Sequence, residues 1–532
     1  MTAQELAAPE LAVDIAAARA RNSYKWKVLA SVIFGIFMAT LDTTAVNVAF
    51  PTLRLEFGAT LRDSQWIVSI YVLALGIPKP VAGFLADRYG IKRIYLVGLA
   101  TFTVGSVLAG IAPTLWALVI ARAVQGIGGG MAIPLGTAML FTTFSKTELG
   151  LALGVFGLAL LFAPAMGPVL AGVLIDHNHW RWIFFINLPI GALGIVLGSR
   201  FLKENRRESK ATWDTIGIGT AVVGFGATLY GASIVAEVGW TSAQVLAAFG
   251  IGALGLAAFA MNEIFLARDP LLDLRLFRRR VFLVATLVGY VTVIAFFGAE
   301  FLLPVYLQAL RGRPALDAGL ALLPLALVAG LTLPVAGKIY DMIGPRSLVV
   351  AGFCLLAFDT WALSALGSDT SMRWIVMLMI VRGLALGLTV QTPFTAALAD
   401  VGPEAIARGT SLVSSTRYVT QAIGVAVLAT VLASTITPGV RALQRDMTRL
   451  PERHATSLGL CEIDHPQPLA RPSSGARTIA SSAGNWETGP STPACVESLG
   501  GFSRAYRLTF YLSLVALMLG FLLPGWPGKA HV

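Results

Sequence analysis

Charged residues are scarce in this chain of 532 residues, and their scarcity excludes most soluble folds. Asp, Glu, Lys and Arg make up 13% of the sequence, whereas hydrophobic residues make up 56% and the mean hydropathy is +0.74. A soluble globular domain carries about 25% charged residues. Cysteine is rare as well, with three in the chain, and no spacing of ligand residues suits a metal. We therefore predict no metal site.

Nucleotide-binding and catalytic motifs are also missing. No P-loop is present, which argues against an ATP-driven pump. Gly126, Gly128, Gly129 and Gly130 lie inside an apolar run, without the preceding strand that a dinucleotide-binding loop needs. No nucleophile–base pair and no two-carboxylate site indicates hydrolysis. We expect neither an enzyme nor a bound cofactor.

Long apolar runs are what the chain does contain, and they recur almost from end to end. Runs of about 20 apolar residues can cross a bilayer as helices, and they differ from the ten-residue alternation of a membrane barrel. We predict an all-α polytopic membrane protein with 14 spans. The predicted spans are 28–50, 64–86, 93–112, 115–138, 149–175, 181–200, 214–236, 245–266, 282–306, 317–339, 347–367, 373–396, 410–435 and 506–526.

The basic residues predict the orientation of these spans. With the N-terminus in the cytoplasm, the cytoplasmic loops and tails hold roughly 22 Lys and Arg, whereas the short external loops hold about six. We expect a multi-pass protein of the inner (plasma) membrane with both termini in the cytoplasm. The net charge of +11 follows from these loops, so the lipid bilayer is a predicted partner and nucleic acid is not.

Two copies of one loop signature lie 254 residues apart. The first is GFLADRYGIKR at 83–93 and the second is GKIYDMIGPR at 337–346. Each copy has Gly, then Asp four residues on, Gly three further and a base two further. Arg122 and Arg382, which open two similar glycine-containing runs, repeat at a comparable offset. A repeat of this kind predicts two homologous halves, as in many membrane transporters.

The repeat also predicts the domain organisation. The two signatures assign six spans to each half and leave two spans as an insertion between them. The predicted parts are an N-terminal tail (1–27), an N-terminal six-helix bundle (28–200), an inserted helix pair with its flanking loops (201–281), a C-terminal six-helix bundle (282–526) that includes a long external loop (436–505), and a C-terminal tail (527–532).

The predicted external loop differs from the rest of the chain. It is rich in Ser, Pro, Arg and Gly and can bury little apolar surface. It also contains Cys461 and Cys495. Because the outer side of the membrane is oxidising, we predict a disulfide between them. Two free thiols are the alternative, since sequence alone does not determine pairing.

Five motifs give the chain a resemblance to a known family. They are LDTTAVNVAFP (41–51), GFLADRYGIKR (83–93), RAVQGIGGG (122–130), APAMGPVLAG (163–172) and WRWIFFINLPIG (180–191). In this order and spacing they resemble motifs of the major facilitator superfamily, and more narrowly of its 14-span drug:proton antiporters of the EmrB/QacA type. The resemblance covers about residues 25–435 and, more weakly, the last predicted span. It implies the major facilitator fold, with two pseudo-symmetric six-helix bundles plus two inserted helices.

The fifth predicted span holds what resembles the antiporter motif of that family. The resemblance implies that the span is kinked and thinned and that it seals the interface between the halves. Ordinary helix packing is the alternative. Ala163 and Ala171 stand where the family often has Gly, and Ile91 replaces a usual base in the first loop. The motif residues are Pro164, Gly167, Pro168 and Gly172.

Four ionisable residues are candidates for proton coupling. A carboxylate within a membrane span is costly, so Asp42, Asp359 and Glu300 are candidate functional groups. Resemblance implies that the helix of Asp42 meets that of Arg122, and we predict a switchable pair; a static pair that fixes helix packing is the alternative. Asp359 could instead be held neutral, or bonded to Thr360 or a neighbouring helix, and Glu300 could reach the outer water.

Polar and aromatic residues near the predicted centre of the bundle are candidates for a substrate cavity between the halves. Lys79, by contrast, is predicted to extend toward the inner headgroups, since a long basic side chain near a span end can do so. For Arg382 and Arg417, an ion pair or a contact with carbonyl groups inside the bundle is the alternative. The cavity candidates are Asn47, Gln125, Phe297, Glu300, Arg382, Gln391 and Arg417.

The two signature loops are predicted to form a conformational latch on the cytoplasmic face. Their acids can cap a helix or meet bases from another helix, and their glycines allow close approach. Retention of the loop inside by its bases is the alternative, and both can hold. The predicted latch residues are Gly83, Asp87, Arg88, Gly90, Lys92, Arg93, Asp341 and Arg346.

These features predict a function in transport. We expect proton-coupled efflux of drugs or other amphipathic small molecules, with protons and a small-molecule substrate as partners. A dedicated exporter of one metabolite or lipid is one alternative, and a membrane receptor or partner protein that does not transport is another. Whether an adaptor protein and an outer-membrane channel are required stays open at this stage.

Overall fold

The computed structural model describes residues 3–177, 179–204, 213–313, 315–434, 461 and 493–525. These residues form helices and short connections, with no strand among them. The helices are α1 (Ala3–Glu56), α2 (Leu61–Gly76), α3 (Lys79–Tyr89), α4 (Ile91–Gly110), α5 (Leu115–Thr143), α6 (Leu149–Asp176), α7 (Trp182–Phe185), α8 (Asn187–Phe201), α9 (Thr215–Val238), α10 (Ala243–Met261), η1 (Asn262–Leu266), η2 (Leu274–Arg278), α11 (Arg280–Val305), η3 (Tyr306–Leu310), α12 (Ala315–Ile343), α13 (Pro345–Ser364), α14 (Met372–Thr389), α15 (Thr392–Leu398), α16 (Ile406–Ser434) and α19 (Pro493–Gly520).

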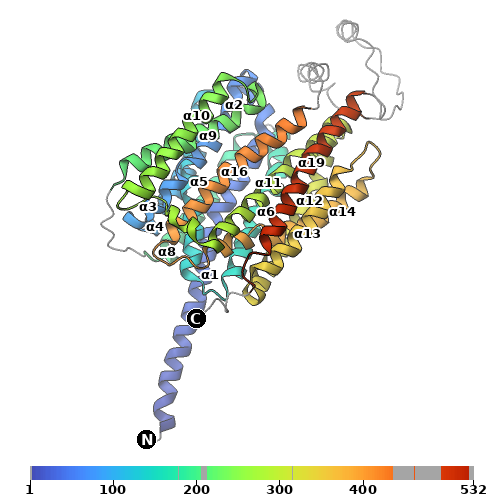
Figure 1. Cartoon of the computed structure of the whole chain (residues 1–532). Coiled ribbons are helices and arrows are strands. Elements are labelled where there is room, and N and C mark those ends of the chain that lie inside the picture. Colours follow the sequence, from blue (N-terminus) through green and yellow to red (C-terminus); the bar gives the residue numbers. More distant parts are fainter. Residues whose placement is uncertain are drawn as a thin grey trace.

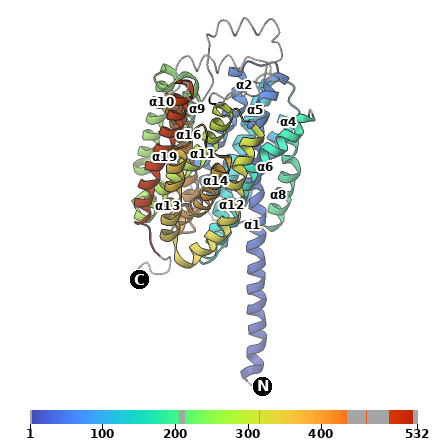
Figure 2. The same cartoon turned by 90° about the vertical axis from the view of Figure 1, so that its right-hand side faces the viewer.

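The helices form two bundles with a helix pair beside them (Figures 1 and 2). Helices α1 to α8 make the N-terminal bundle and α11 to α19 make the C-terminal bundle. The bundles meet where α6 packs on α12 and where α16 packs on α3 and α5. Each bundle has its own apolar core, as expected for two repeated units. We call the end of the molecule that holds the two loop signatures the signature-loop end.

The inserted helices α9 and α10 pack against each other and touch both bundles. Helix α9 lies against α2 on one side and α16 on the other. Trp66 and Tyr230 stack with ring centroids 6.2 Å apart, which joins α9 to α2. The indole Nε1 of Trp240 donates to Thr430 Oγ1 at 2.6 Å, which joins the α9–α10 turn to α16. The insertion is therefore a bridge across the outside of the two bundles.

Three of the predicted spans, 64–86, 181–200 and 373–396, each contain two α-helices, which the apolar runs did not predict. Proline explains the break between α2 and α3, where Asp63–Gly76 and Lys79–Tyr89 meet at 45°. Pro78 has no amide hydrogen to donate, and Pro80 occupies the first turn of α3, where proline is tolerated. Pro393 has the same place at the start of α15, in the second bundle.

The predicted number of spans is compatible with these helices. In the described part of the chain, eleven helices are long and apolar enough to cross a membrane, and the bent α2–α3 pair makes twelve. The other two predicted spans, 282–306 and 506–526, lie on α11 and α19. Fourteen spans therefore stays a prediction, whereas a multi-helix membrane architecture is established.

The predicted N-terminal tail, 1–27, is not separate from the first span. Helix α1 runs without a break from Ala3 to Glu56 and extends well beyond the bundle at the signature-loop end (Figures 1 and 2). Most of the predicted external loop, 436–505, and the predicted tail, 527–532, lie outside the described residues. Helix α19 begins at Pro493, inside the predicted loop.

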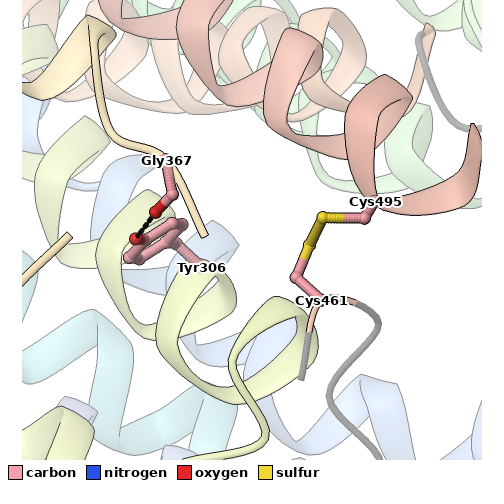
Figure 3. Close-up of a disulfide and its surroundings, with 4 residues drawn as sticks. All are labelled: Tyr306, Gly367, Cys461 and Cys495. Atoms are coloured by element: carbon pink, nitrogen blue, oxygen red, sulfur yellow. Dashed lines mark hydrogen bonds between the residues drawn. A yellow bond between two sulfur atoms is a disulfide. The ribbon is translucent and has the colours of Figure 1, made fainter. Parts of the chain in front are cut away.

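A disulfide joins the start of α19 to Cys461 at the end opposite the signature loops (Figure 3). The Cα atoms of Cys461 and Cys495 are 5.1 Å apart, and both side chains are buried. The amide of Cys461 donates to the carbonyl of Leu310 at 2.8 Å, which holds the bridge against the end of η3. Nearby, Tyr306 Oη donates to the carbonyl of Gly367 at 2.7 Å.

Non-reducing mass spectrometry of a digest tests this bridge in the purified protein. We expect one cross-linked peptide pair that contains Cys461 and Cys495 and that separates on reduction. Cys354 is the internal control, because it is a free, exposed thiol in α13 and should react with an alkylating reagent before reduction. Recovery of Cys461 and Cys495 as alkylated free thiols would contradict the pairing.

Candidate functional site

Asp42 on α1 is the centre of a fully buried polar cluster in the N-terminal bundle. Its Oδ2 accepts a hydrogen bond from Arg122 Nη1 of α5. Its Oδ1 accepts from Gln125 Nε2 at 2.8 Å and from Asn187 Nδ2 at 3.0 Å. Each of these residues is at most 1% exposed. A buried charge is costly unless it is paired and hydrogen-bonded, and this carboxylate is both.

Arg122 has further partners besides Asp42. Its Nη1 also donates to Gln125 Oε1 at 2.6 Å, and its Nε donates to the carbonyl of Ile67 at 3.3 Å. The Tyr71 ring lies under the guanidinium, with 3.9 Å between Cζ and the ring centroid. The ring face attracts the cation in this water-poor site. The predicted Asp42–Arg122 contact is therefore present, within a network that spans four helices of the bundle.

A second buried acid–base pair lies in the C-terminal bundle. Asp359 Oδ2 on α13 accepts from Arg382 Nη1 on α14 at 2.5 Å, and Arg382 Nη2 donates to the carbonyl of Ala295 at 2.6 Å. Asp359 and Arg382 are completely buried. The structure therefore corrects the assignment of Arg382 to the substrate cavity, because its guanidinium is paired with Asp359 inside the bundle.

The second pair has fewer partners than the first. Among the described residues, Asp359 Oδ1, Arg382 Nε and the hydroxyl of Tyr506 on α19 are buried without a hydrogen bond. Asp42, by contrast, accepts three hydrogen bonds. A carboxylate with an unpaired oxygen can take up a proton there without breaking a hydrogen bond, so Asp359 remains a second candidate for proton uptake.

The signature loops connect the two bundles through their acids. Asp341 at the end of α12 accepts from the backbone amides of Gly150 and Leu151 at 2.8 and 3.0 Å, and so caps α6 of the opposite bundle. Asp87 on α3 accepts from Arg408 Nε of α16 at 2.6 Å. Both contacts cross the interface, so the repeated Asp closes the molecule at this end in each half.

The first glycine of each signature allows these helices to touch. A Cβ added at Gly83 would lie 2.6 Å from the carbonyl oxygen of Ala407, and one added at Gly337 would lie 2.1 Å from that of Gly150. Both distances are far below van der Waals contact, and the opposing atoms are backbone. Each glycine is therefore required for the close approach of α3 to α16 or of α12 to α6.

Three of the other predicted latch residues, Gly90, Lys92 and Arg93, have their described contacts within the N-terminal bundle. The backbone amides of Lys92 and Arg93 donate hydrogen bonds to the Glu204 carboxylate, at 3.3 and 3.2 Å. Glu204 therefore caps α4 in the same bundle. Gly90 has φ of +100°, a conformation that favours glycine, and it lies against Glu204. The described contacts of the signatures across the bundle interface therefore come from the glycine and the acid of each copy.

The other two bases predicted for the latch, Arg88 and Arg346, have described contacts with neighbouring segments. The Arg88 guanidinium lies over the ring of Trp213, 5.1 Å from its centroid, just before the inserted helix α9. Arg346 Nε donates to the carbonyl of Leu523 at 2.7 Å and so ties α13 to the end of α19. These contacts stabilise loops inside the insertion and the C-terminal bundle.

Glu148 adds a negative charge at the start of α6, next to the amides that Asp341 caps. Lys25 Nζ donates to Glu148 Oε1 at 2.6 Å, and this hydrogen bond holds the pKa of the Glu148 carboxyl below its usual value. A carboxylate in this position also interacts favourably with the positive end of the helix dipole. Sequence analysis did not single out Glu148, because its role depends on contacts far along the chain.

The motif in α6 contains one close contact of the predicted kind. A Cβ at Gly167 would lie 2.0 Å from Thr44 Oγ1, so this glycine lets α6 pack tightly on α1. Gly172 has open space around it, which corrects its predicted role in close packing. Helix α6 is one continuous helix that includes Pro164 and Pro168. The side chain of Pro168 is outside the described part of the chain.

A cavity lies between the bundles, with an empty volume of about 820 Å³ including its open part. Residues from α1, α3, α5 and α6 line one side, and residues from α11, the α14–α15 break and α16 line the other. Gln391 and Arg417 line it as predicted. The lining residues are Ile36, Lys79, Ile133, Thr137, Phe156, Leu160, Thr292, Val293, Phe296, Val390, Gln391, Phe394, Ser414, Arg417, Tyr418 and Gln421.

Four other cavity predictions have different outcomes. Gln125 belongs to the buried cluster around Asp42, and Asn47 is an exposed residue of α1 that does not line the cavity. Glu300 and Phe297 lie on α11, but their side chains are outside the described part of the chain. Their predicted roles are therefore still predictions.

Lys79 is the cavity residue that sequence analysis placed wrongly. It was expected to extend to the headgroups, yet its side chain is 5% exposed and its Nζ lies 3.5 Å from the Tyr418 ring centroid. The bend at Pro78 turns the start of α3 inward and makes Lys79 its first residue. The unusual Pro-Lys-Pro sequence was the available signal, since prolines inside a span indicate a broken helix.

Two repeated bundles that close on each other around a shared cavity define a membrane transporter, and comparisons with known proteins agree. The chain belongs to the major facilitator superfamily: residues 32–425 match the family described as Major Facilitator Superfamily. Its members are transporters and not enzymes.

Two relatives and one solved structure illustrate the similarity. The chain is 34% identical over 403 residues to the uncharacterized MFS-type transporter YhcA of Bacillus subtilis, with 76% of each chain covered. It is 33% identical over 408 residues to the multidrug resistance protein B homolog of Mycobacterium tuberculosis, with 76% of this chain and 75% of that one covered. The proton:xylose symporter XylE shares the fold at a TM-score of 0.58 and 13% identity, covering 95% and 97%.

Proposed function

We propose that this protein is a proton-coupled exporter of amphipathic small molecules, of the 14-span drug:proton antiporter type. Its proposed place is the plasma membrane, with both termini in the cytoplasm. The observation that supports this best is the combination of two buried Asp–Arg pairs with a cavity shared by two bundles. An ion pair inside a membrane protein is costly and marks a functional site by default.

Proton coupling is proposed at Asp42 and Asp359. Uptake of a proton by either carboxylate weakens its attraction to its arginine, because the charge that holds the pair together is removed. For Asp42, this change reaches Gln125 and Asn187 in the same network and therefore the packing of α1 against α5 and α8. Helix α1 also contributes Ile36 to the cavity, which connects the pair to the cargo site.

Alternating access is proposed to depend on the signature-loop end. Asp341 and Asp87 close this end in the present structure, so cargo in the cavity is separated from the proposed cytoplasmic side. Opening must break both contacts, and a ligand that binds the two states unequally shifts the balance between them. The relative named for multidrug resistance supports drugs as the class of cargo.

The driving force available to such an antiporter is limited. Each proton supplies about 1.4 kcal/mol per pH unit and about 2.3 kcal/mol per 100 mV of membrane potential. One proton therefore supports a cargo gradient of a few powers of ten. This limit excludes very steep gradients unless several protons move for each cargo molecule.

Sealed vesicles containing the purified protein test this function. A panel of fluorescent amphipathic dyes is loaded, and dye movement is followed with and without an imposed pH gradient. We expect dye flux that depends on the gradient, together with proton flux in the opposite direction. Protein-free vesicles and vesicles treated with a protonophore are the controls. Flux of no dye in either condition, with monodisperse protein in the membrane, would contradict the proposal.

A further inference from the structure

The cavity has positive charge from both bundles and no negative charge among the described residues that line it. Lys79 comes from α3 and Arg417 from α16, and neither Asp nor Glu is among the sixteen lining residues. The two buried carboxylates of the bundles, Asp42 and Asp359, are already paired with Arg122 and Arg382. The basic residues of the cavity therefore have no described acidic partner.

Aromatic rings are the described partners of both cations. Lys79 Nζ lies 3.5 Å from the ring centroid of Tyr418, and the Arg417 guanidinium lies 5.4 Å from that of Phe394. A ring face compensates a buried cation only in part, because a cation–π contact is weaker than a hydrogen-bonded ion pair. An incoming anion would supply the missing counter-charge.

The bend in the second span adds to the positive potential. Lys79 is the first residue of α3, and no side chain caps this helix end. Because the N-terminal end of a helix carries partial positive charge, a broken helix inside a membrane protein favours anionic groups at the break. The partial charge of this helix end therefore has the same sign as the charge of the Lys79 side chain.

The rest of the lining describes the other part of the ligand. Phe156, Phe296 and Phe394 present aromatic surface, and Leu160 and Val293 present aliphatic surface. Small polar groups, including Thr137 and Ser414, are interspersed among them. Such a lining suits a flat apolar body with one polar end.

We infer that the cargo of this transporter is an amphipathic anion: an aromatic or otherwise apolar body with one carboxylate, sulfonate or phosphate group. The anionic group binds between Lys79 and Arg417, and the apolar body lies against the phenylalanines. That the anion is transported rests on the proposed function. That the anion binds between these residues does not.

The two cations come from different bundles, which gives the anion a second effect. Without a ligand, Lys79 and Arg417 repel each other across the cavity. An anion between them attracts both, so binding favours the state in which the bundles are close. Cargo thus stabilises closure around itself.

Calorimetric titration with two matched probes tests the inference in an uncharged detergent. Naphthalene-2-sulfonate and 2-naphthyltrimethylammonium share one ring system and differ in the sign of charge. We expect the sulfonate to bind the wild-type protein at least about tenfold more tightly than the ammonium compound, since hydrogen bonds to charged groups have this size of effect. Equal or tighter binding of the ammonium compound would overturn the inference.

Variants then locate the anion. Lys79→Gln and Arg417→Gln should each weaken sulfonate binding about tenfold or more, whereas Lys79→Arg should retain most of the affinity. Arg373→Gln is the matched control, because Arg373 is an exposed base at the start of α14, away from the cavity. If both cavity variants bind the sulfonate as tightly as the Arg373→Gln protein, the site is not between these residues.

Binding and transport can fail separately. Sulfonate binding at the predicted residues without gradient-dependent flux would leave the anion site intact and reject the proposed export. Gradient-driven flux of the ammonium probe, with no sulfonate binding, would support export and reject the anion inference. Size-exclusion profiles of each variant show that loss of binding is not loss of folding.

Discussion

Replacing Asp42 with Asn is expected to reduce proton-driven dye transport to the level of protein-free vesicles. The substitution removes the ionisable group but keeps its shape, so the amide still contacts the neighbours of the carboxylate. Arg122 would then be a buried cation without a counter-charge, and breaking such a pair costs about 3–5 kcal/mol. We therefore expect a lower thermal unfolding temperature in detergent as well as the loss of transport.

A double variant separates these two effects. Asp42→Asn with Arg122→Gln removes both charges, so no unpaired charge stays buried, and an unpaired buried charge is the main cost of breaking such a pair. We expect the double variant to recover the unfolding temperature of the wild type but not its proton-driven transport. Recovery of transport together with stability would show that the pair only fixes helix packing, which is the static alternative.

Asp359→Asn is the matched comparison in the other bundle. Asp359 is equally buried and is also paired with an arginine, but it has one oxygen without a described partner. Full transport by Asp42→Asn and complete loss in Asp359→Asn would move the proton site to the C-terminal bundle. Partial loss in both would indicate that both carboxylates take part.

The substitution Gly337→Ala is expected to prevent complete closure of the signature-loop end. The new Cβ would lie 2.1 Å from the carbonyl oxygen of Gly150, and no side-chain rotation can relieve a contact with backbone. Helices α6 and α12 must move apart, which weakens the capping of α6 by Asp341. Gly319→Ala is the matched control, because Gly319 lies on the same helix with open space around it.

Cross-linking measures this closure directly. Lys146 Nζ and Asp400 Oδ1 lie 3.4 Å apart across the interface and are exposed, so cysteines at these positions can be joined by a short bismaleimide. Cys354→Ser removes the described free thiol from the background. We expect Gly337→Ala to lower the cross-linked fraction at least about twofold, and transport with it. Equal cross-linking of the Gly337→Ala and Gly319→Ala proteins would contradict the role of Gly337.

Much of the architecture was predictable because it depends on composition and repetition. Runs of apolar residues determine where helices cross a bilayer, since every backbone polar group must be satisfied within the helix. The repeated Gly and Asp of the signatures predicted two halves, and all four residues lie in contacts between the bundles. The contact of Asp42 with Arg122 was predicted through the family resemblance.

Other parts of the site could not be predicted, for physical reasons. Asp341 binds backbone amides of α6, and backbone groups have no sequence signature. Arg382 and Asp359 lie on different helices, so no local spacing announced their contact. Lys79 was misplaced because a bend of 45° between α2 and α3 determines which way it points, and hydropathy does not report bends.

The remaining predicted latch bases show what a sequence motif does not predict. Lys92 and Arg93 belong to the repeated signature, yet they cap and brace their own bundle through Glu204. A motif marks residues that are needed together, but it does not say which surface each one contacts. Only the three-dimensional arrangement separates the residues that join the halves from those that support them.

The hairpin of α9 and α10 restricts how far such a protein can rock. The hairpin contacts α2 through Trp66 and Tyr230, and it contacts α16 through Trp240 and Thr430. These helices belong to different bundles, so the hairpin cannot keep both contacts unchanged while the bundles tilt against each other. Each tilt must stretch or slide one of these attachments. In the proposed cycle, the inserted hairpin would therefore act as a tether that limits how far the bundles tilt, and substitutions in it would change turnover without changing the residues that bind cargo or protons.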